Sequence, residues 1–162
     1  MGAERPGRTS GVVGPRRSSN QVIHLDTSFL IRGLVRGTAE DRFLREWLRR
    51  DIPLAISAVG WTEFLCGPVA AAEAELAARI VPDRVPFTAD DSVEAARLFN
   101  LSGRRRGSLA DCMIAATAVR LHASLATTNP ADFRRLESAG LQLVATSGAR
   151  ASTARATRRG SG

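Results

Sequence analysis

The chain has 162 residues, of which 44% are hydrophobic and 24% charged, and its formal net charge is +7. This length and composition indicate one soluble globular domain with a sizeable core. No apolar segment approaches the roughly 18 residues that span a bilayer, and none follows the N-terminal arginines, so we expect neither a membrane span nor a secretory signal. Two cysteines are too few for a disulfide framework, and we expect reduced thiols in a cytoplasmic protein.

The positive charge belongs to the two ends of the chain. Residues 1–20 contain four Arg and one Glu, residues 146–162 contain four Arg and no acid, and residues 21–145 carry 15 Arg and 15 acids. Both ends are rich in Gly, Ser and Arg without an apolar period, which predicts disordered basic tails around one domain at 21–145. Such tails can attract nucleic acid by counterion release, or they can be solvated ends without that role. Whether residues 1–20 belong to the native protein stays open.

Short apolar runs alternate with helical patterns between the tails. In chain order we expect a strand at 22–25, helices at 29–37 and 38–50, a strand at 54–57, a helix that carries Glu63 and ends at Gly67, a helix at 70–80, a strand at 84–87, helices at 88–101 and 111–121, a strand at 125–127, a helical segment at 130–138 and a strand at 141–144. This alternation predicts an α/β domain with a mainly parallel sheet of four to five strands.

Four carboxylates interrupt or follow apolar segments. Asp26 ends the first strand, Glu63 lies among apolar neighbours in its helix, Asp111 opens an apolar helix, and Asp132 follows the strand at 125–127. Acids are rarely buried unless they are paired or hold a cation. Two carboxylates roughly 4 Å apart repel by about 4 kcal/mol at an effective dielectric of about 20. A cluster of four therefore indicates a divalent metal ion, and the chain reads as a metal-dependent enzyme.

Three of these acids also have a local explanation. Asp26 can be the N-cap of the following helix, Ser108 and Asp111 fit a capping box, and Asp132 is the third residue of a helix that begins after Asn129. Such caps lie at the carboxyl ends of strands, where open α/β sheets place their active sites, so the two interpretations are compatible. Glu63 has no capping role. We expect it to be buried in mid-helix beside Gly60, with a metal ion or a water as its partner.

Other kinds of catalytic site are not indicated. His24 and His122 lie outside any Cys/His spacing typical of zinc, so we expect structural roles for both. The sequence has no G-x-S-x-G elbow, no G-x-G-x-x-G motif and no lysine for a P-loop. A haloacid-dehalogenase-like phosphatase needs a second Asp two residues after the first, and that position holds Ser28.

The four acids and their flanking residues together resemble the PIN-domain nucleases, in particular the VapC-type toxins of bacterial toxin–antitoxin pairs. The resemblance covers about residues 21–145 in the family's order. Its motifs are DTS at 26–28, SAVGWTEFLCG at 57–67, RGSLADCMIAATA at 106–118 and TTNPADF at 127–133. Some members carry an acid at the position of Asn129, so the sequence leaves open whether one or two metal ions bind.

The resemblance implies a three-layer α/β/α fold and an endoribonuclease that uses Mg²⁺ or Mn²⁺. It implies that Asp26 and Asp111 bind the metal directly, and that Glu63 and Asp132 bind through water or orient the nucleophile. Thr27, Thr127 and Asn129 are expected to support these ligands or to contact phosphate. Hard cations prefer such oxygen ligands, and a metal-bound water can attack phosphorus to leave a 5′-phosphate and a 3′-hydroxyl.

Partners follow from the same resemblance. Arg104, Arg105 and Arg106 precede Asp111 and are candidates for gripping the RNA backbone, although a solvated loop explains them equally well. A VapC-type toxin implies a cognate antitoxin and a homodimer. The antitoxin would dock in an apolar groove for which the sequence offers five residues, which are equally suited to the core: Phe29, Leu30, Leu34, Phe43 and Trp47.

Two other functions stay open at this point. A PIN-like nuclease can process RNA without being a toxin, and a PIN-like module with a degenerate site can bind RNA without cleaving it. The four retained acids argue against the second, and the small size of the chain favours the toxin.

Overall fold

The computed structural model describes residues 22–104 and 107–145. Both predicted tails, as well as Arg105 and Arg106, lie outside the described residues. Within these ranges, no helix has the length and apolar character needed to cross a bilayer.

A parallel sheet forms the centre of the fold. Its order is β3-β2-β1-β4-β5, and all four neighbouring pairs are parallel. The central strand pairs with both neighbours through the same residues, so that Leu25 lies opposite Ile56 on one side and Ala126 on the other. The strands are β1 (Ile23–Leu25), β2 (Leu54–Ser57), β3 (Asp83–Val85), β4 (Ser124–Ala126) and β5 (Gln142–Leu143). The predicted parallel α/β architecture is confirmed.

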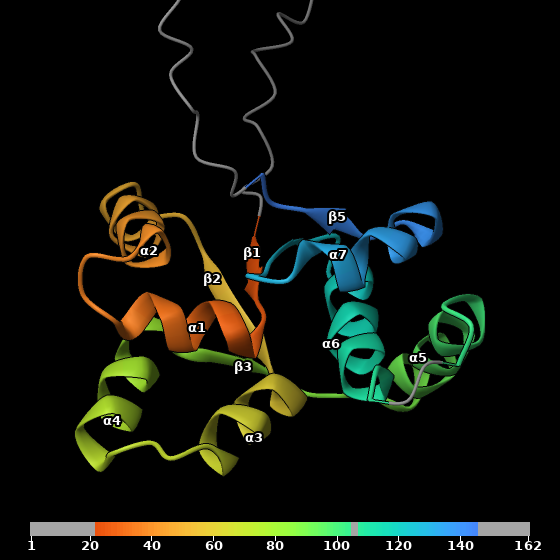
Figure 1. Cartoon of the computed structure of the whole chain (residues 1–162), viewed down its shortest axis with the longest axis horizontal. Coiled ribbons are helices and arrows are strands. Elements are labelled where there is room, and N and C mark those ends of the chain that lie inside the picture. The colour runs from red at the N-terminus through yellow and green to blue at the C-terminus, as the bar shows by residue number, and fades with distance from the viewer. Residues whose placement is uncertain (1–21, 105–106, 146–162) are drawn as a thin grey trace, which may run out of the picture.

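Helices cover both faces of this sheet (Figure 1). One face is covered by α1 (Thr27–Leu34), α2 (Ala39–Arg49) and α4 (Ala71–Ile80), and the other by α5 (Ala89–Leu101) and α6 (Leu109–Arg120). The remaining helical segments are α3 (Ala58–Cys66), α7 (Pro130–Phe133) and the 3₁₀ segment η1 (Arg134–Ala139). The arrangement is the predicted three-layer α/β/α fold.

Side-chain caps fix several helix starts. At the start of α3, Ser57 Oγ accepts a hydrogen bond from the backbone N–H of Gly60. At the start of α2, Thr38 Oγ1 accepts one from the backbone N–H of Asp41. Thr88 and Asp91 form a reciprocal capping box at α5. Each such cap satisfies N–H groups that a helix leaves without partners in its first turn. Helices α2 and α5 therefore begin within a residue or two of their predicted positions.

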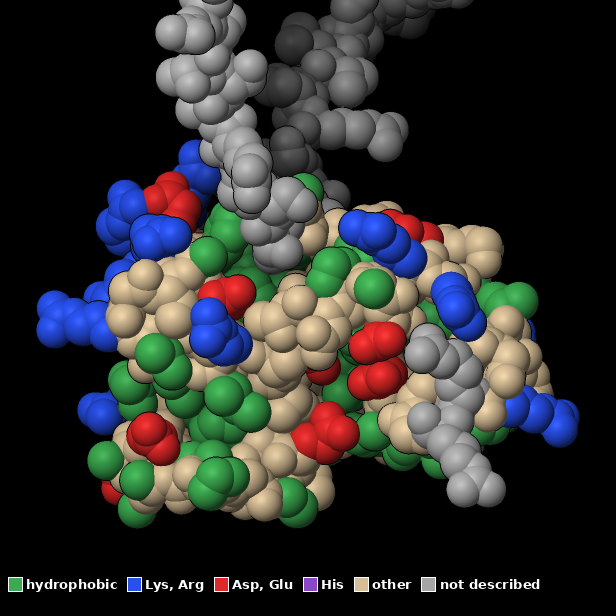
Figure 2. Space-filling view, viewed as in Figure 1, with side chains coloured by type: hydrophobic (Ala, Val, Ile, Leu, Met, Phe, Trp, Pro, Cys, Tyr) green, Lys and Arg blue, Asp and Glu red, His purple; other side chains and the backbone are tan. Residues whose placement is uncertain are grey.

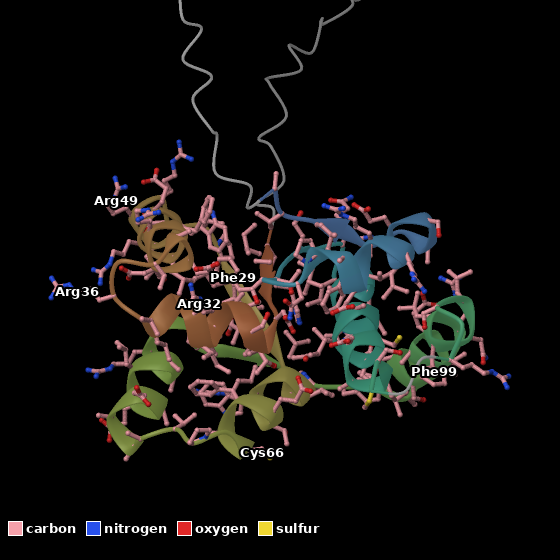
Figure 3. All side chains as sticks on the ribbon, in the orientation of Figure 1. Phe29, Arg32, Arg36, Arg49, Cys66 and Phe99 are labelled. Atoms are coloured by element: carbon pink, nitrogen blue, oxygen red, sulfur yellow. The ribbon has the colours of Figure 1, made fainter. Side chains whose placement is uncertain are left out.

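Two hydrophobic clusters fill the spaces on either side of the sheet. The cluster under α1, α2 and α4 includes Phe29, Leu30 and Trp47, and Phe29 stacks on Trp47 with ring centroids 5.3 Å apart. Figure 3 shows Phe29 directed inward from α1, whereas Arg36 and Arg49 project away from the domain. The other cluster packs α5 and α6 against β4 and η1. Burial of these faces supplies the main driving force for the fold.

A histidine is among the polar side chains buried in this core. His24, the middle residue of β1, is 0% exposed, and neither of its ring nitrogens has a hydrogen-bond partner in the described part of the chain. Burial, together with the nearby positive charge of Arg120, lowers the pKa of His24 to about 4. The imidazole is therefore neutral at pH 7, as expected for a structural histidine.

This burial predicts a specific loss of stability in acid. The unfolded chain protonates histidine near pH 6.5, whereas the folded chain resists until about pH 4, so the free energy of unfolding falls as pH drops between these values. The full loss is about 3 kcal/mol. His24→Leu removes the titrating group, and we predict a flatter pH dependence in urea unfolding at pH 7.5, 6 and 5. His122→Asn, at an exposed position, should keep the wild-type slope. Equal slopes for wild type and His24→Leu would contradict the assignment.

Candidate active site

The order of the strands in the sheet changes direction between β1 and β4. From β1 the chain moves outward to β2 and β3, and it then returns to β4 on the other side of β1. In open α/β sheets, ligands bind in the crevice at the carboxyl ends of such neighbouring strands. Asp26 directly follows β1, and Thr127 directly follows β4. The two motifs, far apart in sequence, therefore meet at the switch point of the sheet.

Asp26 is held by two hydroxyl groups. The side chain of Asp26 is largely buried, and its Oδ2 accepts hydrogen bonds from Ser28 Oγ at 2.5 Å and Thr127 Oγ1 at 2.9 Å. Its backbone N–H donates to the carbonyl of Ala126 at 2.9 Å. Asp26 occupies the N-cap position of α1, but its side chain makes no capping bond. The carboxylate is thus fixed toward the crevice and not used to begin the helix.

The same two hydroxyls fix the loop after β4. Thr127 Oγ1 accepts from the N–H of Asn129 at 3.0 Å, and Ser28 Oγ accepts from the N–H of Thr128 at 3.2 Å. The predicted supporting role of Thr127 thus has a geometric basis. Ser28 was not predicted as a site residue, and its place within the DTS motif was the only signal for it.

Thr27 connects Glu63 to α1. Its Oγ1 donates to Glu63 Oε2 at 2.9 Å and to the carbonyl of Gly60 at 3.0 Å. A Cβ at Gly60 would lie 3.3 Å from Ile56 Cγ1 and 3.4 Å from Thr27 Oγ1, so glycine allows α3 this close approach. The expectation of a buried Glu63 is wrong, because its side chain is exposed while the neighbouring Phe64 is buried in the core.

All four predicted carboxylates line one cleft of about 280 Å³. Figure 2 shows acidic side chains gathered around a hollow near the middle of this face. Thr27, Ser28 and Asn129 also line the cleft. Asp111 is half-buried there, and burial followed by the negative charges of Asp26, Glu63 and Asp132 raises its pKa to about 6. The four acids are therefore close enough to influence one another.

The donor set suits a hydrated divalent cation. Among the described residues, no three Asp, Glu, His or Cys side chains stand in positions that hold an ion directly. Mg²⁺, however, keeps several water ligands and needs only one or two direct carboxylates. Oxygen donors lining one small cleft, with the pKa of Asp111 raised by burial and by its acidic neighbours, fit this mode of binding.

Several sequence predictions around the site need correction. The capping box at Ser108 is not formed, and Asn129 makes no side-chain cap either. Asp111 lines the cleft, so its carboxylate faces the other acids and not the helix start. Arg104 donates to Asn100 Oδ1 at 2.8 Å and does not line the cleft, and its predicted contact with RNA stays a prediction. Arg105 and Arg106 lie outside the described residues.

The predicted apolar groove is largely wrong. Phe29, Leu30 and Trp47 are buried, and Phe43 packs against their cluster, so helix packing has closed most of the expected seam. Leu34 does line an open cavity of about 220 Å³, whose other apolar walls are Leu44, Leu48, Leu76 and Ile80. Sequence periodicity identified the apolar faces but could not say which of them face each other.

The sequence model of the PIN domain matches residues 23–139. The chain belongs to the PIN-domain family. No curated protein sequence matches it. The PIN fold explains why the four acids, taken from four separate elements, line a single cleft.

Solved structures share this PIN fold at low sequence identity. VapBC2 from Rickettsia felis, bound to a promoter DNA fragment, is 19% identical with a TM-score of 0.63 over 76% of this chain and 98% of that one. FitAcB from Neisseria gonorrhoeae is 17% identical with a TM-score of 0.60 over 76% and 97%. VapC20 from Mycobacterium tuberculosis, described as a toxin that cleaves the sarcin–ricin loop, is 19% identical with a TM-score of 0.56 over 75% and 98%.

Burial of Asp111 and its crowding by the other acids predict a stability penalty in metal-free protein. The folded pKa of Asp111 lies above its unfolded value, so the folded state loses stability as pH rises from about 4 to 6 and stays weakened above. Because Asp111 is only half-buried, solvent screening reduces the penalty to about 1 kcal/mol. We predict that Asp111→Asn raises the free energy of unfolding by this amount at pH 7.5 in EDTA, and by much less at pH 4.

A matched substitution controls for the helix position. Asp90 lies in the first turn of α5, is exposed, and does not line the cleft. Asp90→Asn should lower stability slightly, because an acid there interacts favourably with the helix dipole. A loss of stability in Asp111→Asn at pH 7.5 would contradict the proposed repulsion.

Proposed function

We propose that this PIN-domain protein is a metal-dependent endoribonuclease and the toxin of a toxin–antitoxin pair. The observation that carries the proposal is the cleft at the carboxyl ends of β1 and β4, where four carboxylates meet and where burial and the other three acids raise the pKa of Asp111. A polyanionic substrate could enter such a cleft only if a cation offsets the charge. The fold shared with VapC20, which is described as a toxin that cleaves the sarcin–ricin loop, supports the same reaction.

Each carboxylate has a role that matches its surroundings. Asp26 and Asp111 are the proposed direct metal ligands, because they are the more buried pair and Asp26 is already fixed by two hydroxyls. Glu63 and Asp132 are exposed at the mouth of the cleft, where they can orient an attacking water. When bound, Mg²⁺ or Mn²⁺ would lower the pKa of that water and neutralise charge on the phosphate.

The proposed antitoxin partner has a candidate surface. The cavity beside Leu34 lies among α1, α2 and α4, and Leu48 and Leu76 at its rim are 43% and 42% exposed. An amphipathic segment of a partner could bury these side chains, which is a common mode of peptide recognition. Some structural neighbours are described as a toxin–antitoxin complex or a member of a toxin–antitoxin family, which supports such a partner. Homodimerisation and a cytoplasmic location stay predictions.

RNA cleavage is the direct test of this function. We expect antitoxin-free protein to cut total or transfer RNA at discrete positions in Mg²⁺ or Mn²⁺ but not in EDTA. Asp26→Asn should lower the rate at least about 100-fold, the scale of a lost acid–base or metal-activating group. Glu63→Gln should also lower it, whereas Glu75→Gln, at an exposed glutamate on α4, should not.

The alternatives give different results in the same assay. Metal-dependent cleavage by a protein whose expression leaves growth unaffected would indicate an RNA-processing nuclease and not a toxin. Folded protein that binds RNA but neither cleaves it nor binds metal would indicate the non-catalytic module.

Support of Asp26 by Thr127 is separately measurable. Thr127→Val keeps the side-chain shape but removes the hydroxyl that donates to Asp26 and accepts from Asn129. Loss of such an outer hydrogen bond typically weakens metal binding 10- to 100-fold. We predict about a 10-fold weaker affinity for Mn²⁺ by calorimetry. Thr62→Val, which removes an exposed hydroxyl on α3, should leave the affinity unchanged, and equal effects of the two variants would contradict this role.

A further inference from the structure

A second cavity adjoins the acidic cleft. It has a volume of about 210 Å³, and its walls include Ser102, Ser108, Cys112 and Arg135. It also includes Asp111 and Asp132, the two acids that it shares with the cleft. The two cavities therefore share a wall, and a substrate held at the carboxylates would extend into the second cavity.

Arg135 brings a positive charge to the second cavity, beside the two acids that this cavity shares with the cleft. It is the only basic residue among the described residues that line either cavity. Its guanidinium makes no hydrogen bond or ion pair within the described part of the chain, although Asp111 and Asp132 line the same cavity. By contrast, Arg97 and Arg120 are paired with Glu94 and Asp91. Arg135 is thus available to an external anion.

The local structure directs Arg135 toward this wall. Asp132 lies in α7 and Arg135 follows in η1, which continues the same helical path. Residues three positions apart in such a segment lie on the same side. The cavity is also lined by Ser108, the N-cap residue of α6, where backbone N–H groups and the helix dipole favour negative charge. Arginine and helix start therefore face the same small space.

We propose that Arg135 binds a phosphate of the RNA backbone next to the scissile phosphate, and that the second cavity accepts the adjoining nucleotide. The planar guanidinium suits this task because it can donate two parallel hydrogen bonds to phosphate oxygens. The cavity is smaller than the roughly 300–1,000 Å³ of a site for a drug-sized ligand, which suits one nucleotide unit. Arg135 is then a positioning residue that selects a continuous polynucleotide. This inference rests on the proposed ribonuclease function.

The neighbouring arginine provides a matched control. Arg134 is exposed, has the same charge, and lines neither cavity. Wild type, Arg135→Gln, Arg135→Lys and Arg134→Gln would be compared for binding of a fluorescent single-stranded oligoribonucleotide in Ca²⁺ over a range of salt concentrations. Kinetics in Mg²⁺ on the RNA that wild type cleaves would separate kcat from KM, and melting temperatures would verify folding.

We expect Arg135→Gln to weaken RNA binding about 10-fold and to reduce the slope of log K against log salt by about 0.7, the value of one phosphate contact on a single strand. KM should rise with kcat nearly unchanged, and Arg135→Lys should restore part of the affinity because it keeps the charge. Arg134→Gln should change binding less than about twofold, since it alters only the general field.

The outcomes separate this inference from the function on which it rests. If wild type cleaves RNA and Arg135→Gln binds and cleaves like wild type, the phosphate contact is wrong and the nuclease stands. Equal losses in Arg134→Gln and Arg135→Gln would likewise overturn it, because net charge alone would then explain the binding. If wild type neither binds nor cleaves RNA with any metal, both proposals fail together.

Discussion

Repulsion among four carboxylates at one edge of the sheet is the constraint on which the rest of the site depends. The fold limits this repulsion in three ways. Two hydroxyl donors stabilise the charge of Asp26, and a third, from Thr27, holds Glu63. Glu63 and Asp132 stay exposed to water, which screens their charge. At Asp111, burial and the remaining repulsion raise the pKa to about 6. A cation in the cleft would relieve this repulsion, and the free energy gained would favour its binding.

The strand order explains how these groups come together. Strands β1 and β4 are parallel neighbours, so the segments that follow them leave the sheet at the same end. The chain goes on from β1 to β2 on the other side, which leaves a crevice between these two segments. The backbone bond between Asp26 and Ala126 and the hydroxyl of Thr127 then connect the two segments. The site is thus built by contacts between residues about a hundred positions apart. Its geometry therefore depends on the pairing of the central strands.

The sequence predicted the parallel sheet, most element boundaries and the four acids that line one cleft. These features could be predicted because they depend on local patterns. Period, caps and strand ends can be identified from neighbouring residues, as at Thr88 and Asp91. Burial was harder to predict. Glu63 has apolar neighbours in sequence, but the helix turns Phe64 inward and leaves Glu63 at the cleft mouth. The bonds of Ser28 and the placement of Arg135 depend on tertiary packing, for which a single sequence carries no direct signal.

A metal ion between Asp26 and Asp111 is the central claim, and a crystal structure with Mn²⁺ tests it most directly. Anomalous scattering would locate the ion without reference to activity. We expect a peak in the cleft, coordinated by oxygen atoms of Asp26 and Asp111 and by water, and absent in Asp26→Asn crystals treated identically. No peak in the cleft at Mn²⁺ concentrations that support cleavage, or a peak that persists unchanged in Asp26→Asn, would contradict it.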